Sequence, residues 1–421
     1  MGELQPKNLK QKLEKVSPLS PRCCIYRVPK RLRNQNEKAY TPQVVSIGPL
    51  HHGGKDLEAM EDHKIRYVKD FLERTKVSME ECFNALKEWE TEIRACYAVK
   101  IEYEETELVE MVLVDSIFIF ELLLRFPYPA LQKEKVDRVF GKPWMQRDIT
   151  YDLLLLENQI PFFILEYLYS LALTRNTIPL EANGVLSLFE LTHRFLGKSV
   201  YIWPYAEMKK KLEHKQIQHF VDFVLTCHRP LPSELPNAKK LTTLTIPNAT
   251  ELYQSGVKFV KVDDKNIFDI KFKNGVLKIP HLRIRGSTEI FFRNLIAYEQ
   301  CEFHDHYFHD YVFIMDGLVD SSKDVDLLVK AGILDSKLPD SEATASFISS
   351  LDSGPILFSK KSYVTDLCDA LNAYYRVPQH KWKASLKQDY FSTPWAGLSI
   401  VVAAILVVLT FIQTVCSIMS L

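Results

Sequence analysis

The densest group of residues able to do chemistry is the segment CEFHDHYFHD, which holds His304, His306 and His309. On a helix, His306 and His309 would share one face. Glu302 and Asp310 would lie on that same face. Imidazole and carboxylate groups at this spacing are able to bind zinc. Solvated histidines on an exposed helix are the commoner explanation, so we predict no metal and no cofactor and keep the three histidines as residues to inspect.

A second histidine pair, His51-His52, stands between Gly48-Pro49 and Gly53-Gly54. Adjacent histidines in a glycine-rich loop could supply a catalytic base or a ligand. Neither Ser46 nor a cysteine is placed to reveal a nucleophile beside them. We therefore expect a structural turn.

Four carboxylates lie in strongly apolar helical surroundings and together would suggest a di-metal site in a helical bundle. They are Asp115, Glu121, Asp152 and Glu157. Such a site needs a histidine three residues after a ligating glutamate. Leu124 and Ile160 occupy those positions. We expect the carboxylates instead to cap neighbouring helices or to pair with Arg125 or Arg147.

The polar run Glu157-Asn158-Gln159 interrupts a leucine-rich segment just before Pro161. The residue before a proline is biased away from helix, so the backbone should bend at Ile160. A binding notch is one interpretation. We favour a helix kink whose freed carbonyl groups are satisfied by the two side-chain amides.

The absence of known catalytic motifs and the balance of charge exclude several classes of protein. The sequence has no phosphate loop, dinucleotide turn, serine nucleophile elbow or zinc-protease helix, so we predict no catalytic residues. Lys+Arg and Asp+Glu number 53 each, which argues against nucleic-acid binding because phosphate neutralisation needs surplus positive charge.

The eight cysteines lack disulfide-scaffold spacing, and we expect most to be reduced, with Cys23-Cys24 packed. Asn248-Ala249-Thr250 is a glycosylation sequon, which matters only in a domain facing the lumen or the cell exterior.

Apolar residues recurring every three or four positions predict helices over most of the chain. We place them at 60–74, 80–98, 106–125, 149–173, 186–195, 208–226, 288–301, 307–319, 324–331 and 361–375. Between 241 and 285 the pattern alternates, with turn residues such as Asn274-Gly275, and predicts a small antiparallel sheet. Strands flanked by helices without regular βαβ alternation indicate an α+β fold that is predominantly α-helical.

The last thirty or so residues, from Tyr390 to Leu421, carry no charge and are rich in Leu, Ile, Val and Phe. A helix over 394–418 would be about 36 Å long, against a hydrocarbon core of about 30 Å. We predict one C-terminal transmembrane helix that binds the lipid bilayer. Its anchor residues are Trp395, Ile400, Leu406, Phe411 and Ile418.

The residues around that helix predict its topology. Basic side chains precede it between 380 and 387, and the basic segment 1–20 has no apolar signal region and should be mobile. These features predict a single-pass, tail-anchored protein of the plasma membrane or an endomembrane, with its main domain in the cytosol.

Several segments resemble the plant family catalogued as domain of unknown function 247. They include IYRVPKRLR, YTPQVVSIGPLHHG, DLLLLENQIPFFIL and IPNATELYQSGVKF, and they recur in the expected order along most of the chain. The resemblance implies one family-like domain over 21–385, largely helical, with a C-terminal membrane segment and no assigned activity. Recognition or signalling at a membrane follows by analogy only.

Two functions remain open on the sequence. The first is a membrane-anchored, non-catalytic module that recognises unknown protein partners. The alternative is a membrane-tethered enzyme, a hydrolase using His51 or His52 or a metal-dependent enzyme using the cluster at 304–309. A buried pocket with convergent polar groups around those histidines would favour the enzyme.

Overall fold

The computed structural model describes residues 20–132, 137–182, 184–197, 205–213, 215–230, 245–263, 266–302, 306–352, 362–385 and 394–419. The chain forms two compact units, one from residues 1–229 with 287–304 and the other from 230–286 with 305–421. Both fall largely within the single domain expected over 21–385. The segment 1–20, expected to be mobile, lies outside the described residues except at its last position.

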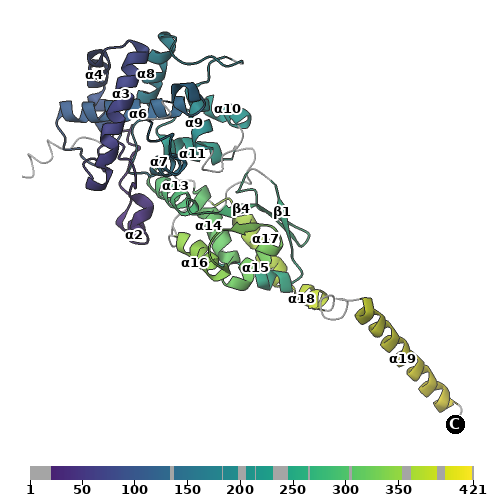
Figure 1. Ribbon diagram of the computed structural model, residues 1–421. Coiled ribbons are helices and arrows are strands. Elements are labelled where there is room, and N and C mark those ends of the chain that lie inside the picture. Colours follow the sequence, from purple (N-terminus) through teal and green to yellow (C-terminus); the bar gives the residue numbers. More distant parts are fainter. Residues whose placement is uncertain are drawn as a thin grey trace, which may run out of the picture. The chain divides into compact units, whose positions relative to one another are not determined.

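The first unit is helical and is built around one long apolar helix, α6 (Glu105–Arg125) (Figure 1). Nearly every side chain of α6 from Leu108 onward is buried, which explains why its sequence is apolar on all sides. Helices α3, α4, α8 and α9 pack against it. The other helices of this unit are α2 (Lys30–Arg33), α3 (Glu58–Thr75), α4 (Met79–Glu88), α5 (Glu90–Ala95), α7 (Pro143–Asp152), α8 (Phe162–Thr174), α9 (Leu188–Leu196), α10 (Tyr205–Glu213), α11 (Phe220–His228) and α13 (Thr288–Glu302), with short 3-10 turns η1 (Glu37–Tyr40), η2 (Lys55–Leu57) and η3 (Pro129–Leu131).

Three predicted helices are each two helices in the structure. The helix expected over 149–173 ends at Asp152 as α7 and resumes at Phe162 as α8. The prediction was wrong there because Pro161 has no amide hydrogen and because the intervening polar side chains bind backbone groups elsewhere. The stretch 80–98 divides at Trp89 into α4 and α5, and 208–226 divides into α10 and α11.

All the strands found in the described residues belong to the second unit. Its helices are α12 (Ala249–Gln254), α14 (Tyr307–Leu318), α15 (Ser322–Lys330), α16 (Ser341–Leu351), α17 (Thr365–Tyr375), α18 (Pro378–Ser385) and α19 (Pro394–Met419), and its strands are β1 (Lys258–Val262), β2 (Lys271–Lys273), β3 (Val276–Pro280), β4 (Leu282–Ile284) and β5 (Leu334–Ser336). Helices α12, α16 and α18 and strand β5 were not predicted. With six and three residues, α12 and β5 are too short to show a clear period.

The sheet differs from the antiparallel one expected. Strands run in the order β1-β3-β2, with β2 antiparallel and β1 parallel to β3. The β2–β3 hairpin forms at the predicted turn, where Asn274 (φ 53°) and Gly275 (φ 74°) adopt the left-handed conformations that a tight hairpin requires. Strand β1 enters on the far side of β3, so the sheet is mixed. The fold is mostly helical with a small mixed sheet.

The C-terminal helix requires a correction. Helix α19 covers the five predicted anchor positions, and Leu406, Phe411 and Ile418 are exposed. However, none of the helices in the described part of the chain is long and apolar enough to cross a membrane.

The predicted transmembrane helix over 394–418 is therefore not supported. The single-pass, tail-anchored localisation and the predicted contact with a lipid bilayer depended on that helix. They are withdrawn with it.

Candidate functional site

The polar run that breaks the leucine-rich segment is the centre of the most elaborate polar site in the first unit. The Glu157 side chain is 1% exposed. It accepts hydrogen bonds from the Val28 amide (2.6 Å) and pairs with the Arg33 guanidinium (2.6 Å). Arg27 lies 3.3 Å and His51 Nε2 3.4 Å from the same carboxylate. The buried Glu157 carboxylate thus contacts three basic side chains that lie more than 100 residues earlier in the sequence.

Opposing effects set the charge of this carboxylate. Burial alone would raise the pKa of Glu157, but the contacts from His51, Arg33 and the Val28 amide lower it below its ordinary value. The group therefore stays ionised at neutral pH. Its partners Arg27 and Arg33 are 52% and 22% exposed, so the site reaches the surface through its cations.

Asp152 holds the next part of the same N-terminal segment. Its carboxylate accepts the backbone N–H groups of Gln43 (2.8 Å), Val44 (2.7 Å) and Val45 (2.8 Å). Burial raises the pKa of Asp152 to about 7, although these three donors favour the charged form. The side chain serves as an acceptor for a loop that lacks strand partners.

The two amides of the run confirm the predicted role. Asn158 Nδ2 donates to the carbonyl of Asp152 (3.0 Å), and Gln159 Nε2 donates to those of Leu153 (2.7 Å) and Leu155 (2.8 Å). These are carbonyl groups freed where helix α7 ends. Asn158 also bridges to the N-terminal segment, accepting from the Ile47 amide (2.8 Å).

Lys64 completes the arrangement from helix α3. Its Nζ is fully buried and donates to Asp115 (2.6 Å) and to the Ser46 carbonyl (2.6 Å). Burial opposes its charge, but Asp115 and Glu61 raise the pKa of Lys64. Asp115 also accepts the Gly48 amide (2.7 Å). We call residues 24–48 the strap, because Glu157, Asp152, Asn158, Lys64 and Asp115 fasten it to the helices.

The His51-His52 loop lies at the end of the strap. His51 faces Glu157, and the His52 ring contacts Tyr103 edge to face at 6.0 Å. Ser46 Oγ is buried without a hydrogen-bond partner in the described structure. It therefore makes no hydrogen bond to His51, and no serine–histidine pair of a nucleophilic enzyme is assembled here.

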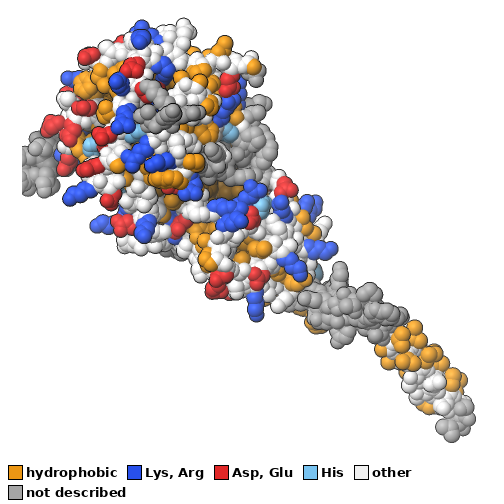
Figure 2. Space-filling view, in the orientation of Figure 1, with side chains coloured by type: hydrophobic (Ala, Val, Ile, Leu, Met, Phe, Trp, Pro, Cys, Tyr) orange, Lys and Arg blue, Asp and Glu red, His pale blue; other side chains and the backbone are white. Residues whose placement is uncertain are grey.

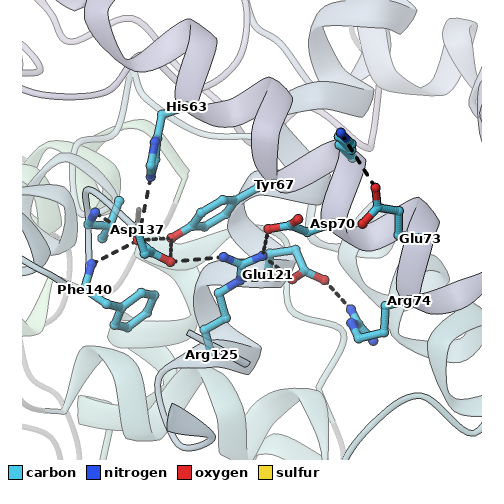
Figure 3. Close-up of polar contacts among 11 residues, drawn as sticks. His63, Tyr67, Asp70, Glu73, Arg74, Glu121, Arg125, Asp137 and Phe140 are labelled. Carbon is cyan, nitrogen blue, oxygen red and sulfur yellow. Dashed lines mark hydrogen bonds and ion pairs between the residues drawn. The ribbon is translucent and has the colours of Figure 1, made fainter. Parts of the chain in front are cut away.

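A second polar network lies between α3 and α6, where Arg125 is the central cation (Figure 3). Its guanidinium donates to Asp137 (3.0 Å) and Asp70 (2.8 Å). It also donates twice to Glu121 within α6 (3.1 Å each). The same group lies 3.9 Å from the centre of the Tyr67 ring. The expectation that a buried carboxylate pairs with Arg125 is confirmed for Glu121, whereas Asp115 pairs with Lys64 and Glu157 with Arg33.

Asp137 is the anion that this network shares most widely. Burial would raise its pKa, but His63, the Phe140 amide, the Tyr67 hydroxyl and Arg125 lower it to about 2. Arg147, the other predicted partner of a buried carboxylate, pairs with Asp148 instead (3.2 Å). In both networks, around Glu157 and around Arg125, ion pairs connect segments that are distant in the sequence.

The histidine cluster is divided between two elements. Helix α13 ends at Glu302 and α14 begins at Tyr307, so the single helix face expected over 302–310 does not form. His304 lies outside the described residues. The His306 and His309 rings are 6.5 Å apart, and Asp310 accepts from the Ser362 hydroxyl (2.7 Å). The described residues contain no group of three or more His, Cys, Asp or Glu able to hold a metal ion.

A cleft of about 540 Å³ in the second unit is lined by both His309 and Asn248. Its walls are acidic, with Glu251, Asp316, Asp320 and Asp352. Asn248 caps helix α12 by accepting the Glu251 amide (2.9 Å), and Thr250 Oγ1 donates to Asp324 (2.6 Å). The sequon residues thus have structural roles that the sequence pattern did not reveal.

All eight cysteines are free thiols. Cys24 is buried, and its amide donates to the Cys96 carbonyl (2.9 Å) at the start of the strap. The packing expected of Cys24 is confirmed, while Cys23 is half-buried.

Comparison with known proteins identifies the family of this chain. The profile of a family described as plant protein of unknown function, DUF247, matches residues 25–409. The chain belongs to this family. It is 27% identical to the UPF0481 protein At3g47200 of Arabidopsis thaliana, over 94% of this chain and 87% of that protein. It is 23% identical to the putative UPF0481 protein At3g02645 of the same plant, over 97% and 92%. No solved structure matches.

Sequence reasoning missed several residues of these networks. The contacts of Lys64 with Asp115 and of Tyr67 with Asp137 give no local signal, because they join residues 51 and 70 positions apart. Arg27 and Arg33 were not among the predicted site residues. Their pairing with Glu157 depends on contacts across about 130 residues, which one sequence does not encode locally.

Proposed function

We propose that this member of the plant family is a non-catalytic protein-interaction module that acts in recognition or signalling. The observation that carries the proposal is the fastening of the strap by Asp152, Glu157 and Asn158. These are the side chains whose types best suit chemistry, and each is committed to backbone groups or internal ion pairs.

The fastening has a consequence for the surface. The backbone amides of Val28, Val44 and Gly48 each donate to a buried carboxylate. Loops fixed in this way lose little conformational entropy when a partner binds, and this favours affinity. Arg27 and Arg33 are presented at the edge of this rigid segment.

The enzyme alternative has one supporting observation. His51 is 15% exposed and lies 3.4 Å from a buried carboxylate, and a carboxylate that orients a histidine is part of many catalytic sites. A metabolite-conversion screen comparing the purified chain with His51→Ala tests it. Substrate turnover that disappears in the variant would establish the enzyme and overturn the non-catalytic proposal.

Proximity labelling in plant cells tests the interaction proposal directly. The full chain is fused to a biotin ligase, and the ligase alone serves as the control. We expect the same small set of neighbouring proteins in every replicate. Replicates with no neighbours in common beyond those of the control would contradict the proposal.

A further inference from the structure

One face of the three-stranded sheet in the second unit carries a concentration of positive charge. The strand register places side chains from β1, β2 and β3 on a common face. Four of them are exposed lysines: Lys258, Lys271, Lys273 and Lys278. We call this surface the lysine face. Figure 2 shows Lys and Arg side chains gathered in the region where β1 lies in Figure 1.

The opposite face of the sheet is covered. Leu277 and Ile279 are fully buried, and the Phe272 ring contacts Tyr374 of helix α17 at 5.4 Å. The sheet is therefore fixed to the unit by its apolar side. The lysine face is turned to solvent within the described structure, and Val260 on it is 39% exposed.

Protection against aggregation explains only some of these lysines. Lysine is common on edge strands because its charge discourages pairing with another chain. Lys258 lies on edge strand β1, and Lys271 and Lys273 lie on edge strand β2. Lys278 lies on the central strand β3, which has no free edge to protect. Another reason is needed for its presence.

The strand register places Lys278 where its charge destabilises the sheet of the isolated protein. It lies directly opposite Lys271 across the β2–β3 pair. Like charges in that relation repel each other and destabilise the sheet. Asp269 neutralises Lys271 at 2.6 Å. No ion pair to Lys258, Lys273 or Lys278 is formed by the described residues. An anionic partner would supply opposite charge to these three lysines.

The positive field extends beyond this face. Burial lowers the pKa of His281, which follows β3, and the charges of Lys261 and Arg283 lower it further.

We propose that the lysine face binds an acidic, extended segment of a protein partner. Alternate residues of an extended chain are about 6.6 Å apart, which matches the spacing of alternate lysines along β2. Val260 and the half-buried Val276 lie between the lysines and offer apolar contacts that a peptide side chain can use.

A phosphate polymer fits this surface less well than a peptide. It would gain little from the valines, and phosphate recognition favours the two-pronged guanidinium of arginine over lysine. The four cations of this face are all lysines. The inference rests on the proposed interaction function and names the chemistry of the partner.

Fluorescence anisotropy of the full chain with a labelled peptide of alternating Glu and Val tests the inference. We expect saturable binding that weakens as salt rises, and none to the same peptide with Gln in place of Glu. The double variant Lys258→Glu with Lys278→Glu should bind at least about tenfold more weakly. Glu at 278 would face Lys271 across the sheet, so the variant should keep its fold, which circular dichroism checks.

The matched control carries Lys69→Glu with Lys323→Glu, an equal change of charge on exposed lysines of helices α3 and α15. Its affinity should stay within roughly twofold of the natural chain, because only charges close to the ligand matter at moderate salt. Equal losses in both double variants would reduce the effect to net charge and overturn the inference.

Two further probes test the class of partner. They are vesicles containing phosphatidylserine and a single-stranded oligonucleotide. Binding of either probe through the lysine face, without binding of the acidic peptide, would overturn the inference. If the peptide fails while proximity labelling still finds consistent neighbours, this inference fails and the interaction function stands. If both fail, both are wrong.

Discussion

At the scale of single residues, the polar side chains buried in the first unit act mainly as partners for backbone groups. His219 is a further example, in addition to the side chains that accept hydrogen bonds from the strap. Its Nδ1 accepts the Asp222 amide (3.2 Å) and caps helix α11, so the proton must be on Nε2, which donates to the Cys24 carbonyl (3.0 Å). Burial lowers the pKa of His219 to about 4. The ring is neutral in the folded chain.

A pH dependence follows from that neutral ring. The unfolded chain gains a proton on His219 near pH 6.5 and the folded chain only near pH 4. Its contribution to stability is therefore complete above pH 6.5 and is lost as the pH falls toward 4. His219→Asn keeps a capping side chain without titrating. Between pH 7 and pH 5, the natural chain should lose about 2 kcal/mol more unfolding free energy than the variant.

Urea unfolding at the two pH values measures this difference. The variant is its own reference, because other titrating groups, including Asp152, are common to both proteins. Parallel losses in the two proteins would show that His219 is protonated in the folded state.

Whether the role of a buried polar residue could be predicted depended on how far away its partners lie in the sequence. The amides of Asn158 and Gln159 satisfy carbonyl groups within six residues of themselves, and their role was predicted. The partners of Glu157 and Asp152 were not, because they lie more than 100 residues away in the sequence. Local spacing shows that a carboxylate will be buried, but it does not show which distant amide approaches it.

At the scale of elements, the turn that ends the strap is limited by glycine geometry. Gly48 has φ of 71°, and a Cβ added there would lie 2.5 Å from the Gln159 carbonyl oxygen. Gly53 in the same loop has φ of 78°, but an added Cβ would meet nothing within 4 Å. The two positions share a strained backbone and differ in the space around it.

This contrast predicts different costs for the same substitution. Gly53→Ala should lower the unfolding free energy by about 1 kcal/mol, the cost of a left-handed alanine. Gly48→Ala should cost at least about 3 kcal/mol, because the strap must also move away from Gln159. Chemical denaturation of the two variants checks this. Equal costs would mean that the strap shifts freely and is not fastened as described.

The elements themselves were foreseen best where a long apolar pattern was present. Helices α3, α6 and α13 were predicted to within two residues at each end. Short elements such as α12 and β5, and the parallel pairing of β1 with β3, depend on tertiary contacts. The C-terminal helix was predicted as an element, but the membrane span assigned to it was not supported.

At the scale of the whole molecule, the first unit is discontinuous in sequence. The chain leaves it after Arg229 and returns for residues 287–304, which include α13 (Thr288–Glu302). That helix is deeply integrated. Asn294 accepts the Leu156 amide (2.9 Å) and donates to the Ala39 carbonyl (2.8 Å), and the Tyr298 hydroxyl donates to Gln218 (2.7 Å).

A chain that stops at Arg229 should therefore not fold. It would leave the Leu156 amide and the Ala39 carbonyl without partners and would expose the apolar surface that α13 covers. We expect an aggregated or unfolded product by size-exclusion chromatography and circular dichroism. Adding α13 as a separate peptide should restore part of the helical signal. A stable monomeric fragment without α13 would show that the helix is dispensable.

The strap also determines when the protein can fold during its synthesis. It is translated first, but Val28 must wait for Glu157, 129 residues later, and Ala39 for Asn294, 255 residues later. At about 5 to 20 residues per second, the second wait lasts roughly 13 to 50 s. For that time the apolar strap residues remain uncovered on the ribosome. We therefore expect the growing chain to be bound by chaperones of nascent polypeptides, and its yield to fall when translation outpaces them.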